Sequence, residues 1–460
     1  MAGRLARHPG GYPPRFGGVR GAFMSEPFSR RKVAGSALTT PHFMLLFAAM
    51  LVAAAGNTAL QSVMPAIGRA IGIADLYVAV AYTSSAVLWV LFAPYWARMS
   101  DRHGRKALTL LGVGGFIVSM TLCGLVLAFG LGHVISGALT FTLFACARAI
   151  YGGLGCATPS ATQAYLASRT RRSARVSALS SLSSSFGLGT IVGPALAPLF
   201  VLPFVGLPGP LFAFALIALC VFVAILLWLP DDSRPRERRG HGAAMSYPSI
   251  ASSPTGASIV ASTAPRVARL KWNDRRIRNW IIAGVVSGHA QAAVLTCLGF
   301  FVIDRLGLAP RGSEQSIAIV MMAGAAATLA AQWGLIPRLA LPPRALILWG
   351  ALIAAAGTAV TMFATDLYGL VLGFGISSLG FGFTRPGFTG GASLAVPLAE
   401  QGGVAGVITA ANGIAYVAAP TIGMALYAID PHWPFAVSGA LLIGLSLWGR
   451  RALHAVPSPV

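Results

Sequence analysis

Three side chains that could move a proton or hold an anion lie inside long apolar stretches of the sequence. They are Arg148, His289 and Arg385. Histidine changes charge near neutral pH and can carry a proton, whereas arginine keeps its charge and attracts a negative partner. The sequence therefore points to proton or anion chemistry in apolar surroundings, although each of these residues could instead serve packing alone.

Carboxylates, the usual partners in such chemistry, are scarce in this chain. Its 460 residues include only 12 Asp and Glu against 34 Lys and Arg, a formal net charge of +22. Every Asp and Glu falls at the edge of an apolar stretch or between two stretches. A relay of carboxylates in the middle of an apolar stretch is therefore excluded.

The composition indicates the class of protein to which these residues belong. The chain is 56% hydrophobic and 10% charged, with a mean hydropathy of +0.73, whereas soluble domains carry roughly 25% charged residues. Soluble and disordered classes are thereby excluded, and an integral membrane protein remains. The five cysteines lie in apolar stretches without metal-ligand spacing, so we expect no disulfide framework, metal site or cofactor.

Twelve stretches approach the roughly 20 apolar residues that a membrane span needs. The sequence predicts an all-α membrane protein whose twelve transmembrane helices form two six-helix halves, 41–230 and 277–450. A cytoplasmic tail (1–40), a polar linker (231–276) and a second tail (451–460) complete the chain. The predicted spans are 42–67, 76–97, 107–129, 135–160, 174–200, 209–229, 279–303, 315–337, 345–364, 367–393, 403–428 and 433–449.

The positive charges predict the orientation of these spans. If both termini are cytoplasmic, 29 of the 34 Lys and Arg residues fall in cytoplasmic segments, as the positive-inside rule requires. The excess of positive charge then reflects topology and needs no nucleic-acid partner. We expect a multi-pass protein of a bacterial inner membrane, a monomer whose surroundings are the lipid bilayer.

The two halves repeat one another. Residues 186–197 (FGLGTIVGPALA) align with 412–423 (NGIAYVAAPTIG), which pairs Pro194 with Pro420 at an offset of 226. Pro159 pairs with Pro386 at an offset of 227. Parallel repeats around a central cavity are one of the schemes that transporters use.

Four motifs resemble those of the major facilitator superfamily, in particular its drug:proton antiporter branch. ARMSDRHGRK (97–106) resembles the loop 2–3 signature G-x-L-A-D-R-x-G-R-K, and RAIYGGLG (148–155) resembles the fourth-helix arginine motif. GLGTIVGPALA (187–197) is similar to the fifth-helix G-x-x-x-G-P signature, and TRPGFTGGASLA (384–395) to the tenth helix of tetracycline and quinolone exporters.

The resemblance implies two conformational elements. The loop 2–3 residues would latch the outward-facing state, although their charges could also serve topology alone; they are Asp101, Arg102, Gly104, Arg105 and Lys106. The fifth-helix residues would seal the two halves and relate to export, although small residues also serve ordinary helix packing; they are Gly187, Gly189, Gly193, Pro194 and Ala197.

The chain departs from this family at the proton site. The resemblance gives Arg148 a role in proton transfer or in holding an anion, but the first-helix acidic position holds Gly56 and the fourth-helix one holds Ser168. Either His289 carries the coupling proton, or Arg148 and the substrate share it, or transport is not proton-coupled.

The resemblance also places a cavity between helices one, four, seven and ten. Its candidate polar residues are Asn57, Gln61, Arg148, His289, Gln291 and Arg385. Two arginines without an acid favour an anionic or zwitterionic amphiphile. We therefore expect efflux of small amphipathic compounds by alternating access, coupled to protons. An organic-anion importer or facilitator is the alternative.

Classes other than transport find less support. The sequence contains no HExxH motif, no Ser/His/Asp-like set and no P-loop, so an enzyme or an ATP-driven machine is not indicated. A membrane sensor or scaffold would normally bring a folded soluble domain, and no segment is long enough for one.

Overall fold

Helices account for almost all of the structure. The computed structural model describes residues 40–169, 172–231, 273–310, 312–396 and 401–453. Within these ranges, a helix lies over each of the twelve predicted spans. The tail 1–39, most of the linker 231–276 and residues 454–460 fall outside the described residues.

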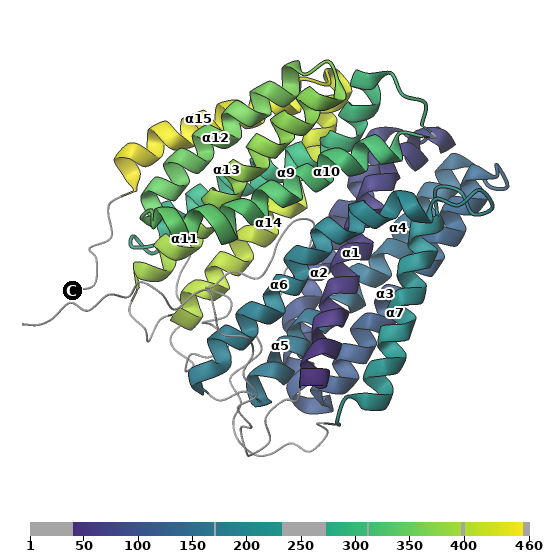
Figure 1. Ribbon diagram of the computed structural model, residues 1–460, viewed down its shortest axis with the longest axis horizontal. Coiled ribbons are helices and arrows are strands. Elements are labelled where there is room, and N and C mark those ends of the chain that lie inside the picture. Colours follow the sequence, from purple (N-terminus) through teal and green to yellow (C-terminus); the bar gives the residue numbers. More distant parts are fainter. Residues whose placement is uncertain (1–39, 170–171, 232–272, 311, 397–400, 454–460) are drawn as a thin grey trace, which may run out of the picture. The chain divides into compact units, whose positions relative to one another are not determined.

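The first half consists of six helical rods, two of which change helix type along their length (Figure 1). A π-helical segment, η1, continues α4 and is followed by α5; α6 runs into the 3₁₀ segment η2. The elements are α1 (Thr40–Ile71), α2 (Asp75–His103), α3 (Arg105–Leu131), α4 (Gly137–Ile150), η1 (Tyr151–Gly155), α5 (Ala157–Arg169), α6 (Arg172–Leu196), η2 (Ala197–Phe200) and α7 (Gly209–Trp228).

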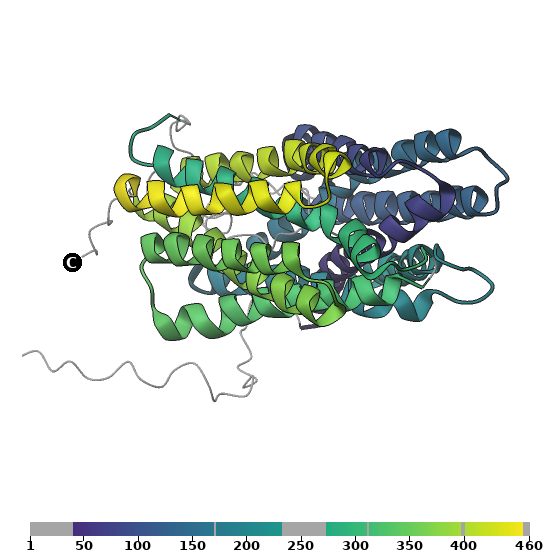
Figure 2. The same ribbon diagram turned by 90° about the horizontal axis from the view of Figure 1, so that it is seen from above.

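The second half has the same plan. Here the interrupted rod is the second, where the π-helical segment η3 joins α10 to α11. The elements are α9 (Arg278–Leu306), α10 (Glu314–Leu329), η3 (Ala330–Leu335), α11 (Ile336–Leu339), α12 (Pro343–Phe363), α13 (Leu367–Leu394), α14 (Gln401–Ile429) and α15 (Trp433–Ala452). Figures 1 and 2 both show these green-to-yellow helices beside the purple-to-teal helices of the first half.

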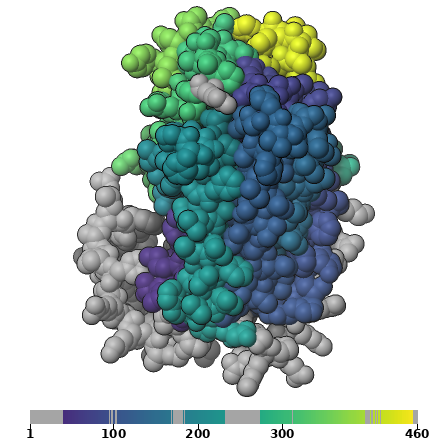
Figure 3. Space-filling view, turned by 90° about the vertical axis from the view of Figure 1, so that its right-hand side faces the viewer, coloured from purple at the N-terminus to yellow at the C-terminus, as the bar shows by residue number. Residues whose placement is uncertain are grey.

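The helices have the length and polarity that a bilayer demands. Among the described residues, nine helices are long and apolar enough to cross a membrane. Figure 3 shows the surface formed largely by the first half, and α7 illustrates why that surface suits lipid. Its Leu216 and Leu227 are 62% and 66% exposed, which is stable against hydrocarbon but costly in water.

The internal repeat reappears in the packing. The fifth rod of each half lies against the first: α6 packs on α1, and α14 packs on α9. Pro194 lies inside α6 and Pro420 inside α14. The equivalent helices of the two halves therefore make equivalent contacts.

Candidate functional site

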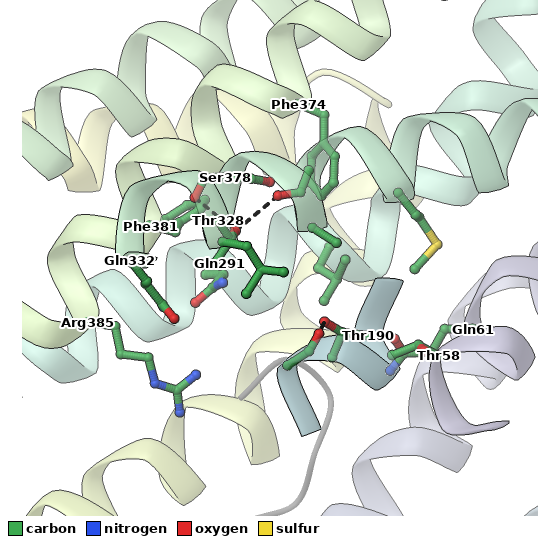
Figure 4. Close-up of a pocket in the computed structure, with 16 residues that line it drawn as sticks. Thr58, Gln61, Thr190, Gln291, Thr328, Gln332, Phe374, Ser378, Phe381 and Arg385 are labelled. Atoms are coloured by element: carbon green, nitrogen blue, oxygen red, sulfur yellow. Dashed lines mark hydrogen bonds between the residues drawn. The ribbon is translucent and has the colours of Figure 1, made fainter. Parts of the chain in front are cut away.

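A cavity lies between the two halves, as Figure 4 shows. It encloses about 780 Å³ of space between atoms, counting the part that is open to solvent. Five rods contribute to its wall. The lining residues are Thr58, Gln61, Gly187, Thr190, Gln291, Leu295, Met321, Gly324, Ala325, Thr328, Leu329, Gln332, Phe374, Ser378, Phe381 and Arg385.

The first-half wall depends on a close approach of α6 to α1. A Cβ atom on Gly193 would lie 2.2 Å from the carbonyl oxygen of Ala55, and one on Gly189 would lie 2.7 Å from that of Leu51. Only glycine permits this spacing. The hydroxyl of Thr58 also donates to the carbonyl of Gly189 at 3.3 Å. The fifth-helix glycines thus hold α6 against α1 within the first half.

The other residues of this motif continue the same helix. Gly187 reaches the cavity wall beside Thr190. Pro194 lies near the end of α6, where its missing N–H and fixed φ weaken the helical ladder. Ala197 begins η2 and is buried. The motif therefore shapes one cavity wall as well as packing α6 on α1.

The second-half wall combines polar and aromatic side chains. The hydroxyl of Thr328 donates to the carbonyls of Gly324 and Ser378, at 3.0 and 3.1 Å. A Cβ on Gly324 would lie 2.2 Å from the ring of Phe374, so the glycine leaves room for that ring. Gln332 belongs to the π-helical segment η3, and such segments are frequent at functional sites.

Arg385 gives the cavity its charge. It lies half-buried on α13, one residue before Pro386. It is the single charged side chain among the described lining residues, which include no Asp or Glu. In Figure 4, Arg385 lies beside Gln332, while Thr58, Gln61 and Thr190 lie on the opposite wall. The cavity therefore offers one positive charge, amide and hydroxyl groups, and apolar surface.

Arg148 occupies a separate buried site in the first half. It is 2% exposed, and its Nη2 donates to Oδ1 of Asn57. The guanidinium carbon lies 5.1 Å from the ring centre of Tyr82 and 4.9 Å from that of Tyr151. Two aromatic faces and an amide therefore stabilise this cation.

No carboxylate compensates the charge of Arg148 within the described part of the chain. Its Nε and Nη1 atoms are buried there without a hydrogen-bond acceptor. A buried cation without an anion is costly. Neither Arg148 nor Asn57 lines the cavity.

His289 also lies outside the cavity wall, although Gln291 on the same helix is part of it. Its Nδ1 lies 2.8 Å from the carbonyl oxygen of Val285. Because a carbonyl only accepts, Nδ1 carries the proton, and Nε2 is the nitrogen that can take up a second one.

The loop 2–3 motif connects α2 to α3. Gly104 separates the two helices with φ +92°, which disfavours any side chain. Lys106 donates to the carbonyl of Leu226 on α7 at 2.9 Å, and the carbonyl of Arg105 accepts from Thr109. The side chains of Asp101 and Arg102 lie outside the described residues.

The fifth and eighth spans contribute cavity residues that the sequence analysis did not single out. Thr190 lies on α6, while Thr328 and Gln332 come from the eighth span. A usable signal was present, because Thr328 and Gln332 are four residues apart and helical periodicity brings such positions to one face. Within the described ranges, no group of three or more His, Cys, Asp or Glu could hold a metal ion.

Comparisons with known proteins bear on this arrangement. The Major Facilitator Superfamily model matches residues 46–342. The chain is 25% identical over 410 residues to Multidrug resistance protein 2 of Bacillus subtilis (strain 168), covering 88% of this chain and 94% of that protein. It is 30% identical over 158 residues to Tetracycline resistance protein, class B, of Escherichia coli, covering 33% of this chain and 34% of that protein.

Solved structures share the fold. The human organic anion transporter MFSD10 superposes with a TM-score of 0.61 and 18% identity, covering 89% of this chain and 99% of that one. The nucleoside transporter NupG superposes with a TM-score of 0.65 and 11% identity, covering 90% of this chain and 100% of that one. At these identities the likeness concerns the fold alone.

Proposed function

Because this chain belongs to the Major Facilitator Superfamily, we propose that it exports small amphipathic compounds by alternating access between its two halves. It is a membrane transporter rather than an enzyme. The observation that carries the proposal is the cavity between the halves, whose wall combines polar and apolar side chains. Export is further supported by bacterial relatives named for multidrug and tetracycline resistance.

The preferred substrate is anionic or zwitterionic. Arg385 is the single charge among the described lining residues. A negative group on the substrate would gain from its field in partly desolvated surroundings, whereas a lipophilic cation would be repelled. Phe374 and Phe381 offer aromatic surface to the apolar part of the substrate, and Gln291 and Gln332 offer hydrogen bonds.

Proton coupling rests on His289. Protonation of its Nε2 would place a positive charge in the middle of α9, next to the turn that carries Gln291. Replacement of His289 by Ala should abolish efflux driven by a pH gradient while expression stays intact. Unchanged efflux would remove His289 from the mechanism and leave Arg148, together with the substrate, as the coupling site.

An organic-anion importer or facilitator is the second candidate. The absence of Asp and Glu among the described cavity residues favours it, because a positively charged cavity can bind an anion without any proton site. The two candidates differ in their response to a pH gradient, which drives an antiporter and leaves a facilitator unaffected.

The remaining assignments follow from the sequence. We place the transporter in a bacterial inner membrane as a monomer, with both termini and the linker 231–276 in the cytoplasm. The halves then span 41–230 and 277–450, and the tails cover 1–40 and 451–460. The loop 2–3 motif would lie on the cytoplasmic side, where the family resemblance gives it the role of a latch.

The test is transport by purified protein in proteoliposomes with an imposed pH gradient. Two fluorescent naphthalene probes of similar size serve as substrates, one a carboxylate and the other a quaternary ammonium. We expect the carboxylate to move faster and the gradient to accelerate it. Faster movement of the ammonium probe would refute the substrate class, and indifference to the gradient would refute antiport.

A further inference from the structure

Four polar residues from both halves meet at one end of the helices. Arg69 lies near the end of α1, and Asp75 is the first residue of α2. Asp304 lies near the end of α9, and Tyr427 near the end of α14. Two of the residues therefore come from each half.

Arg69 joins two carboxylates that belong to different halves. Its Nη2 donates to Oδ2 of Asp75 at 2.7 Å and to Oδ2 of Asp304 at 2.8 Å. Its Nη1 donates to the second oxygen of Asp304. The hydroxyl of Tyr427 donates to Asp304 at 2.5 Å. Asp304 is thus held by the first half through Arg69 and by its own half through Tyr427.

Partial burial strengthens these interactions. The side chains of Arg69, Asp75 and Asp304 are 20%, 22% and 38% exposed. Salt screens such pairs less than fully exposed ones, and a two-pronged arginine–carboxylate contact is among the stronger ion pairs. The guanidinium of Arg69 also lies 5.5 Å from the ring centre of Phe300, on the second half.

A second, smaller pocket lies next to this network. It encloses about 460 Å³ by the same measure as the cavity. Gln61, Leu295 and Met321 line both spaces. Phe300, whose ring lies beneath Arg69, lines the smaller one. The smaller pocket therefore extends the cavity towards the network.

We propose that Arg69, Asp304 and Tyr427 form a gate that closes this end of the transport route. The inference rests on the proposed alternating access, because the gate has to open for a substrate to pass. When the halves separate, Arg69 keeps Asp75, which belongs to its own half, and Asp304 keeps Tyr427. Each charge retains a partner, so opening costs only the contact between the halves. In the proposed topology this end faces away from the cytoplasm.

The gate can be tested through the distance between the halves. Spin labels at Val134→Cys, in the loop between α3 and α4, and at Ala309→Cys, after α9, report on this end of the two halves. The five native cysteines are first replaced by Ala. Pulsed electron resonance on protein in lipid nanodiscs then gives the distance distribution without any substrate.

The expected result is a shift towards the longer distance. Arg69→Gln and Asp304→Asn should each raise the ratio of long to short distances about fivefold, the upper end of what a partly exposed, well-aligned ion pair contributes. Arg305→Gln is the matched control, because Arg305 neighbours Asp304 but its contacts among the described residues, with Phe301, Met362 and His432, lie within its own half. Its distribution should match the wild type.

Two results would overturn the gate. One is an unchanged distribution in both Arg69→Gln and Asp304→Asn; the other is an equal shift in Arg305→Gln. If those variants fail to fold, Tyr427→Phe provides the test, because it removes only the hydroxyl that Asp304 keeps when the halves separate. This variant should shift the distribution towards the shorter distance, and a shift towards the longer distance or no shift would count against the gate. Because no substrate is used, a failed transport assay would refute the proposed function and leave this outcome unaffected.

Discussion

Substitution of Gly193 by Ala tests how the structure builds the first-half wall of the cavity. The added Cβ would lie 2.2 Å from the carbonyl oxygen of Ala55 and equally close to the hydroxyl oxygen of Thr58. A backbone carbonyl inside a helix cannot turn away. Helix α6 would therefore have to retreat from α1 by about 0.8 Å before the first contact reached 3.0 Å.

The cost follows from this displacement. Overpacking of a tight contact costs about 1–3 kcal/mol. The hydrogen bond from Thr58 to Gly189, already 3.3 Å long, would weaken further and contribute roughly 0.5–1 kcal/mol. Replacing glycine within a helix returns about 0.5–1 kcal/mol, so we expect a net destabilisation of about 1–3 kcal/mol.

The assay is thermal unfolding of the purified protein, followed by transport of the carboxylate probe. Gly444→Ala is the matched control, because it lies inside α15 and a Cβ there meets no atom within 4 Å. The control should melt at or slightly above the wild-type temperature. Gly193→Ala should melt lower and transport more slowly, because Gly187 and Thr190 would move with α6. Equal melting of both variants would refute the close-packing argument.

Three further predictions concern other parts of the chain. Gly324→Ala should weaken carboxylate-probe binding by roughly tenfold, because its Cβ displaces the ring of Phe374 and repacking costs about 1–3 kcal/mol; fluorescence titration measures this. Gly104→Ala should lower the melting temperature, since a side chain at φ +92° costs about 1–3 kcal/mol. The backbone N–H and ring of His432 hold the pKa of Asp430 below its usual value. The stability gained from these contacts of ionised Asp430 is present above its unfolded pKa of about 3.9 and is lost as pH falls through its folded pKa. An NMR titration should find the pKa of Asp430 raised in His432→Ala.

The helices were predictable because each follows from local composition. An apolar run of about 20 residues between polar segments has few alternatives to a membrane helix. The residues at which the helices end were harder to predict from the sequence. The fourth span was placed at 135–160, yet helical structure continues to Arg169 through the π-helical segment η1. Hydropathy falls before that helix ends, so a search for apolar residues stops early.

The site was only partly accessible to sequence reasoning, because a cavity depends on how helices rotate against one another. Gln61, Gln291 and Arg385 line the cavity, whereas Arg148 and His289 lie elsewhere. Nothing in a single sequence states which side of a helix faces the other half. The interhelical contact of Arg69 with Asp304 was equally hidden, since 235 positions separate the two residues.

The charge of Arg385 is the feature from which the proposed substrate class follows, and its reversal tests that claim most directly. The measurement is the ratio of carboxylate to ammonium transport in proteoliposomes, for the wild type and for Arg385→Glu. The account predicts a ratio well above one for the wild type and below one for the variant. A ratio that stays the same after reversal of the charge would contradict it.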